Sequence, residues 1–135
     1  MKETTHDQIQ YLAENRISQR GKILAVVTSV KLMGDTDKKT GYELSELARA
    51  YYVFQANGFE VDVASSNGGE APMVIDQDDM KAFDYAFLND SVAMQLVKNT
   101  KALKDINPDE YEAVYFVGGK GAMFDFPNNT YIQSM

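Results

Sequence analysis

The chain has 135 residues, 44% of them apolar, which fits one domain with a hydrophobic core and not two domains. Its 13 basic and 20 acidic residues give a net charge of −7, and no basic cluster stands out, so we expect neither nucleic acid nor an anionic membrane surface as a partner. The absence of cysteine excludes disulfides, thiolate metal sites and a thiol nucleophile within these residues, and the single histidine, His6, argues against a histidine metal site or a Ser-His-Asp triad.

Residues 1–21 are interpreted as a helical appendage that packs outside the main domain. Thr5 and Gln8 have the spacing of a capping box and Gly21 is a suitable stop, so a short helix with a sparse apolar stripe is predicted over residues 5–19. These residues lack the apolar core of an export signal, and no apolar run approaches the ~18 residues of a membrane span. We therefore expect a cytoplasmic protein without a membrane-spanning segment.

The segment Lys22–Ser29, KILAVVTS, is the first predicted strand. Ile23–Val27 is apolar throughout, which is typical of a central strand in a parallel sheet with both faces covered. The polar segment Val30–Thr40 that follows has two interpretations. It is either a solvated connector or one of the loops after strands where sites gather in α/β folds.

Gly41–Asn57 is predicted to form a helix, because its apolar residues follow the 3.6-residue period. Within it, Glu46 lies on a flank that becomes apolar further along, at Ala50 and Val53. A partly desolvated carboxylate has a raised pKa that suits proton transfer, so Glu46 is a candidate general acid/base. The alternative is an exposed first-turn glutamate favoured by the helix dipole, and Glu43 has the same alternative with less to support a role.

Phe59–Ser65, FEVDVAS, alternates in polarity and is the second predicted strand, joined to the first through the helix as a right-handed βαβ unit. The later loop Pro72–Met80 carries three aspartates that could suggest calcium, at Asp76, Asp78 and Asp79. The loop lacks the spacing of an EF-hand and its closing glutamate. We therefore expect no metal site.

Lys81–Thr100 is predicted to hold one helix or two short ones, and it leads to the stretch Tyr111–Phe126, YEAVYFVGGKGAMFDF. Ala113–Val117 forms an unbroken apolar run, which favours a third strand covered on both faces. Three glycines follow within a few residues: Gly118, Gly119 and Gly121. Glycines at the carboxyl end of a strand can leave amide N–H groups facing outward as an anion or oxyanion nest, or can form a plain tight turn.

Strands that alternate with helices indicate an α/β fold, here a flavodoxin-like three-layer sandwich with a mostly parallel sheet in which the second and third strands flank the first. In that order the loop after Ser29, the helix start with Glu46 and the glycine turn at 118–121 meet at the carboxyl ends of the strands, so a carboxylate would face an oxyanion site. A third strand that is apolar on both faces would leave an open edge. We therefore expect a sheet that is incomplete at the C-terminus and is completed by more of the domain or by a partner chain.

Three stretches resemble the ThiJ/PfpI family: TGYELSELARAYYVF at 40–54, FEVDVASSNGGEAP at 59–72 and DEYEAVYFVGGKGAMFDFP at 109–127. Within the class I glutamine-amidotransferase-like superfamily, they are most similar to the branch of glyoxalase III-type enzymes and heat-shock chaperones. The resemblance covers about residues 22–129. It implies that residues 22–135 are the N-terminal portion of a ThiJ/PfpI-like domain.

The resemblance also implies roles for individual residues. In the family, an acidic residue near the start of the first helix hydrogen-bonds the nucleophilic cysteine or moves protons, and Glu46 matches this position. The glycine turn supplies oxyanion donors, and Gly118, Gly119 and Gly121 match it, with Lys120 where members usually carry histidine. The family's cysteine lies on the next strand, which this chain does not contain, so the resemblance implies that the chain alone is inactive.

The implied function of the completed domain is that of a lyase that converts an α-oxoaldehyde, a small carbonyl substrate, to a hydroxy acid without a cofactor. A related hydrolase or amidase activity is not separated from it, and whether this chain by itself is an enzyme stays open. The alternative is a non-catalytic binding or chaperone-like module that forms a homo-oligomer, or captures a complementing fragment, through its open sheet edge. A flavodoxin-like nucleotide or flavin binder is a third hypothesis, but GGKG lacks the GxGxxG spacing and does not follow the first strand.

Overall fold

The computed structural model of the chain describes residues 20–32, 39–118 and 126. The predicted N-terminal helix at 5–19 lies outside the described residues, and so do three residues of the glycine turn, Gly119, Lys120 and Gly121. What the structure does describe is the sheet, the helices that pack on it and the start of the glycine turn.

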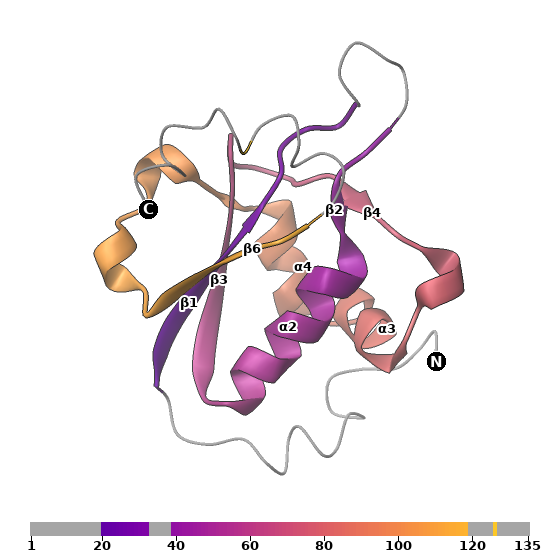
Figure 1. Cartoon of the computed structure of the whole chain (residues 1–135), viewed down its shortest axis with the longest axis horizontal. Coiled ribbons are helices and arrows are strands. Elements are labelled where there is room, and N and C mark those ends of the chain that lie inside the picture. Colours follow the sequence, from indigo (N-terminus) through magenta and orange to yellow (C-terminus); the bar gives the residue numbers. More distant parts are fainter. Residues whose placement is uncertain (1–19, 33–38, 119–125, 127–135) are drawn as a thin grey trace.

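Four parallel strands form the main sheet: β1 (Gly21–Val27), β3 (Phe59–Ser65), β5 (Lys101–Ala102) and β6 (Ala113–Phe116). Their order is β5-β3-β1-β6, and β1, β3 and β6 are labelled in Figure 1. The predicted arrangement, with the second and third predicted strands on either side of the first, is therefore confirmed, and so is the α/β fold. The short strand β5 extends the sheet beyond β3 and was not predicted.

The central strand β1 connects two hydrophobic clusters, because successive side chains of a strand point to opposite faces of the sheet. One set of its side chains enters the larger cluster, where the sheet packs against α2 (Leu44–Ala56), α3 (Ala82–Leu88) and α4 (Ser91–Lys98). The other set, Leu24 and Val26, enters a smaller cluster on the opposite face, next to the 3₁₀ turns before β6. Figure 1 shows the three helices gathered on one side of the sheet.

A second, two-stranded sheet, one strand of which leads directly into α2, was not predicted. In it, β2 (Tyr42–Glu43) pairs in parallel with β4 (Met73–Val74), and the N–H of Tyr42 donates to the carbonyl oxygen of Pro72 at 2.9 Å. This close approach depends on Gly41, because a Cβ there would overlap the carbonyl oxygen of Pro72. The helix predicted to start at Gly41 therefore begins only after β2.

The third predicted strand, β6, is not covered on both faces, which corrects the expectation drawn from its apolar run. Ala113 and Phe116 are exposed, and Phe116 keeps 42% of its accessible surface. The physical reason is that β6 is an edge strand of the described sheet and pairs with β1 alone. Phe126 packs edge-to-face on Phe116 with ring centroids 5.9 Å apart, which covers only part of the strand.

The predicted helical segment Lys81–Thr100 holds two short helices. Asp90 is the N-cap of the second helix, α4. Its Oδ1 accepts hydrogen bonds from the N–H groups of Val92 and Ala93, so a new helix starts there. Among the described residues, no helix is both long and apolar enough to cross a membrane.

Candidate functional site

Glu46 and Gly118 lie next to each other where the start of α2 meets the end of β6. The N–H of Glu43, the residue before α2, donates to the carbonyl oxygen of Gly118 at 3.1 Å and ties the two elements together. A Cβ placed on Gly118 would lie 2.5 Å from Oε2 and 2.9 Å from Oε1 of Glu46, so the carboxylate lies against the glycine Cα. The candidate acid is therefore positioned at the first residue of the glycine turn.

Glu46 is an exposed residue, which corrects the expectation that its flank of α2 is partly desolvated. Val53, on the same flank, is 44% exposed. The flank lies next to β6, the edge strand, so it is open to solvent within the part of the chain that the structure describes. Gly119, Lys120 and Gly121 lie outside that part, and their position relative to Glu46 stays a prediction.

Tyr115 is a residue of this site that the sequence did not single out. Its hydroxyl donates to the main-chain carbonyl oxygen of Glu46 at 3.2 Å, and its ring packs edge-to-face on Phe54 with centroids 5.7 Å apart. Burial raises the pKa of Tyr115, and the negative charge of Glu46 raises it further, so the phenol is protonated at neutral pH. Tyr115 thus holds the first turn of α2 against β6. In the sequence, Tyr115 was noted only as a member of the apolar run shortly before the glycines, and that run indicated a strand.

The loop after β1 begins at the carboxyl end of that strand, where it contacts the turn after β3. Thr28 is buried, and its Oγ1 accepts a hydrogen bond from the N–H of Val30 at 3.0 Å. Ser29 Oγ accepts from the N–H of Asn67 at 2.8 Å, which joins the end of β1 to the turn after β3. That this loop and Glu46 belong to the same site stays a prediction.

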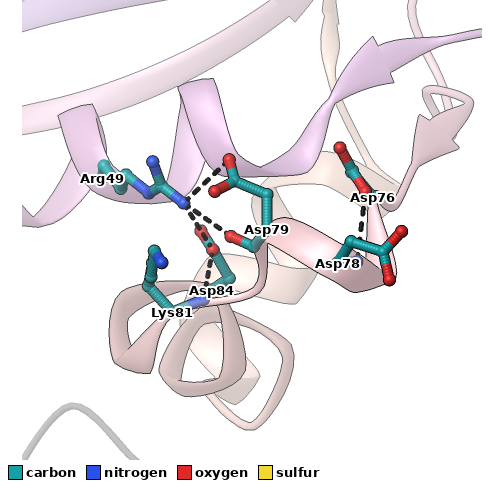
Figure 2. A network of polar contacts seen from close by, with 6 residues as sticks. All are labelled: Arg49, Asp76, Asp78, Asp79, Lys81 and Asp84. Atoms are coloured by element: carbon teal, nitrogen blue, oxygen red, sulfur yellow. Dashed lines mark hydrogen bonds and ion pairs between the residues drawn. The ribbon is translucent and has the colours of Figure 1, made fainter.

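The carboxylates of the acidic loop before α3 make structural contacts. Asp76 Oδ1 accepts from the N–H of Asp78 at 3.1 Å. Asp79, which is half exposed, and Asp84, which is buried, both pair with Nη2 of Arg49, at 3.4 and 3.1 Å (Figure 2). Within the described residues, no group of three or more potential metal ligands occurs. The carboxylates of Asp79 and Asp84 therefore connect the loop and α3 to α2.

Most of the chain is similar in sequence to one part of several known proteins. No family model matches the chain. Glyoxalase 3 of Candida albicans is 30% identical over 122 residues, which are 84% of this chain and 50% of that protein. The glutathione-independent glyoxalase hsp3102 of Schizosaccharomyces pombe is 32% identical over 102 residues, which are 73% of this chain and 42% of that protein. The chain thus spans about half the length of the curated relatives it matches.

Solved structures show the same extent of similarity. The Rapid Encystment Protein 24 KDa of Francisella tularensis has a TM-score of 0.76 and 39% identity, over 84% of this chain and 51% of that chain. Glyoxalase III from Candida albicans has a TM-score of 0.69 and 28% identity, over 87% of this chain and 51% of that chain. Most of this chain therefore has the fold of one half of each of these proteins.

Proposed function

This chain is a homologue of the glutathione-independent glyoxalases of the ThiJ/PfpI family, and we propose that it forms the acid-bearing half of such an enzyme. The completed protein would convert an α-oxoaldehyde such as methylglyoxal to a 2-hydroxy acid without a cofactor. The observation that carries the proposal is the carboxylate of Glu46 lying against Gly118 at the end of β6.

The reaction needs a thiol, a base and an oxyanion site. A thiol adds to the aldehyde carbon and gives a hemithioacetal, and because the chain has no cysteine, the thiol would come from residues outside it. Glu46 would take the proton from that carbon and return one to the neighbouring carbon, which oxidises the first carbon and reduces the second. Water then hydrolyses the resulting thioester, so the reaction consumes no external oxidant or reductant.

The enediolate that forms between the two proton transfers carries negative charge on oxygen. Main-chain N–H groups of Gly118, Gly119 and Gly121 would stabilise this charge, and Lys120 would add a positive charge within the same turn. The contact between Glu46 and Gly118 supports this assignment, because a base and an oxyanion site must flank the same substrate carbons. Tyr115 would act as a positioning residue through its hydrogen bond to the main chain of Glu46.

Native and denaturing mass spectrometry of the protein purified from its source tests whether a second chain completes the domain. We expect the 135-residue chain alone to turn over no methylglyoxal, and the completed protein to form a hydroxy acid. In the completed protein, Glu46→Gln should lower turnover by about 100-fold, whereas Glu43→Gln, a change in the neighbouring acid, should leave it close to normal. Turnover by the chain alone would exclude the cysteine mechanism, and full activity of Glu46→Gln would exclude the assigned role of Glu46.

The exposed edge of β6 favours a second candidate function, a non-catalytic, chaperone-like module. The outer edge of β6 has no strand partner among the described residues, and Phe116, a residue of β6, is 42% exposed. Unpaired edge strands and exposed apolar side chains are sites of association with another strand. In this function the chain would self-associate or capture a complementing fragment through β6. For either function we propose a cytoplasmic location, which cell fractionation tests.

A further inference from the structure

A pocket of about 660 Å³ lies beside β2 and β4, between the loop after β1 and α4, and it shares no lining residue with the contact between Glu46 and Gly118. Sites for small molecules have volumes of roughly 300–1,000 Å³, so the pocket has the size of a ligand site. Much of its wall is apolar: Leu32, Ala71, Pro72, Met73, Met94 and Val97.

Tyr42 also lines this pocket, and its hydroxyl has no hydrogen-bond partner among the described residues although the side chain is fully buried. The hydrogen bond from its main-chain N–H to Pro72 fixes the residue in β2. Burial raises the pKa of Tyr42, and the charge of Glu70 raises it further, so the hydroxyl is protonated. Glu70, an exposed residue, lines the same pocket. A ligand oxygen that accepts from Tyr42 would satisfy the buried donor.

Among the described residues that line the pocket, lysines outnumber acids. Lys31, Lys39 and Lys98 line it and are exposed, and the acid among the lining residues is Glu70. None of the three lysines forms an ion pair with a residue in the described ranges. In a chain whose net charge is −7, a local positive excess selects for an anion.

We propose that this pocket binds a small organic acid, a carboxylate joined to an apolar chain. The carboxylate accepts a hydrogen bond from Tyr42 and is attracted by the surrounding lysines. The apolar chain lies against Met73 and Met94, whose unbranched thioether side chains adapt to ligands of different shape. The proposal does not depend on the glyoxalase function, because the two sites have no residue in common.

Isothermal titration of the 135-residue chain with octanoate is the first experiment, after circular dichroism and a cooperative melt have shown that the sample is folded. Octan-1-ol has the same apolar chain without the charge, and acetate has the charge without the chain. We expect saturable binding of one octanoate per chain, with octan-1-ol and acetate each at least about tenfold weaker, since each lacks one of the two contacts.

Variants then locate the site. Tyr42→Phe removes only the hydroxyl, and Lys39→Gln combined with Lys98→Gln removes two charges from exposed positions. Each should weaken octanoate binding by about tenfold. Lys104→Gln is the matched control, because Lys104 is exposed and does not line the pocket, and it should leave the affinity unchanged.

Glu70→Gln and nuclear Overhauser effects provide independent readouts. Removing the acid should tighten octanoate binding, and bound octanoate should show contacts to the methyl groups of Met73 and Met94. The proposal is wrong if the folded chain does not bind octanoate saturably, if octan-1-ol binds as tightly, or if the variants of Tyr42 and the lysines keep the original affinity. A folded chain that binds octanoate but fails to support methylglyoxal turnover when completed would remove the glyoxalase proposal and leave this one intact.

Discussion

The carboxylate of Glu46 lies so close to Gly118 that a Cβ on the glycine would be 2.5 Å from Oε2. Gly118 is not among the glycines with a positive φ, so alanine suits its backbone and only the space is lacking. We expect Gly118→Ala to push the carboxylate of Glu46 aside, lowering turnover of the completed enzyme by about tenfold or more while changing the free energy of unfolding by less than about 1 kcal/mol. Kinetics and urea unfolding of the same samples check this. Normal turnover would show that the position of Glu46 is not used in the reaction.

The ion pair between Arg49 and Asp84 should matter for stability. Asp84 is fully buried, its Oδ2 accepts from Arg49 and from the N–H of Lys81, and its Oδ1 has no partner among the described residues. Arg49→Met leaves this carboxylate without its cation, so we expect a loss of about 3 kcal/mol in urea unfolding. Combining it with Asp84→Asn should cost less than the sum of the single changes. Asp79→Asn, at the half-exposed partner, is the control and should cost no more than about 0.5 kcal/mol. A small effect of Arg49→Met would mean that the carboxylate finds another partner.

Asp62 should make stability depend on pH in the acid range. Burial by itself raises the pKa of Asp62, but hydrogen bonds from Tyr111 at 2.8 Å and Lys101 at 3.0 Å, with the charges of Lys101 and Lys22, outweigh it and hold the pKa below its ordinary value of 3.8. A carboxyl group whose pKa is lowered by folding stabilises the fold above its unfolded pKa, and this contribution is lost as the pH falls through the folded pKa.

Asp62→Asn should therefore destabilise the chain clearly at pH 7 and progressively less as the pH falls below about 3.8, the ordinary pKa of the group. Urea unfolding at a series of pH values measures the difference, with Asp105→Asn, a change at an exposed aspartate, as the control. A destabilisation by Asp62→Asn that stays constant across this range would show that the pKa of Asp62 is the same in the folded and unfolded chains.

Phe116→Lys tests the role of the β6 edge. A lysine on an edge strand opposes pairing with a second strand. If the chain self-associates through β6, this change should shift it toward monomer in sedimentation velocity experiments and lower its binding of a hydrophobic dye. Val92→Lys, at a side chain of α4 that is 65% exposed and does not belong to β6, should leave the distribution unchanged. Equal behaviour of the two variants would place self-association elsewhere.

The strands of the main sheet were predictable to the extent that each carries a continuous local signal. Phe59–Ser65 was predicted residue for residue, whereas the predicted strand Lys22–Ser29 differs from β1, Gly21–Val27, by one residue at its start and two at its end. The strands β2, β4 and β5 were missed because each has two residues, too few for any periodicity.

The candidate site was only partly predictable, because its contacts join residues far apart in the chain. Glu46 could be singled out from its place near a helix start, but its exposure depends on which flank of α2 adjoins the edge strand. The hydrogen bond from Tyr115 to Glu46 spans 69 positions, and the pair between Arg49 and Asp84 spans 35. No pattern within a single helix or strand indicates such partners.

The position of β1 in the sheet also has a kinetic consequence. Its neighbours β3 and β6 come from well separated parts of the chain, and Leu24 lies opposite Asp62 on one side and Val114 on the other. Parallel pairing of distant segments has to close long loops before it gains contacts, and domains dominated by such pairing fold in roughly milliseconds to seconds. A single-exponential refolding phase on this timescale is the expected signature of the order β3-β1-β6. Any opening that separates β6 from β1 leaves one side of β1 with an unpaired backbone edge, and such an edge is prone to aggregation.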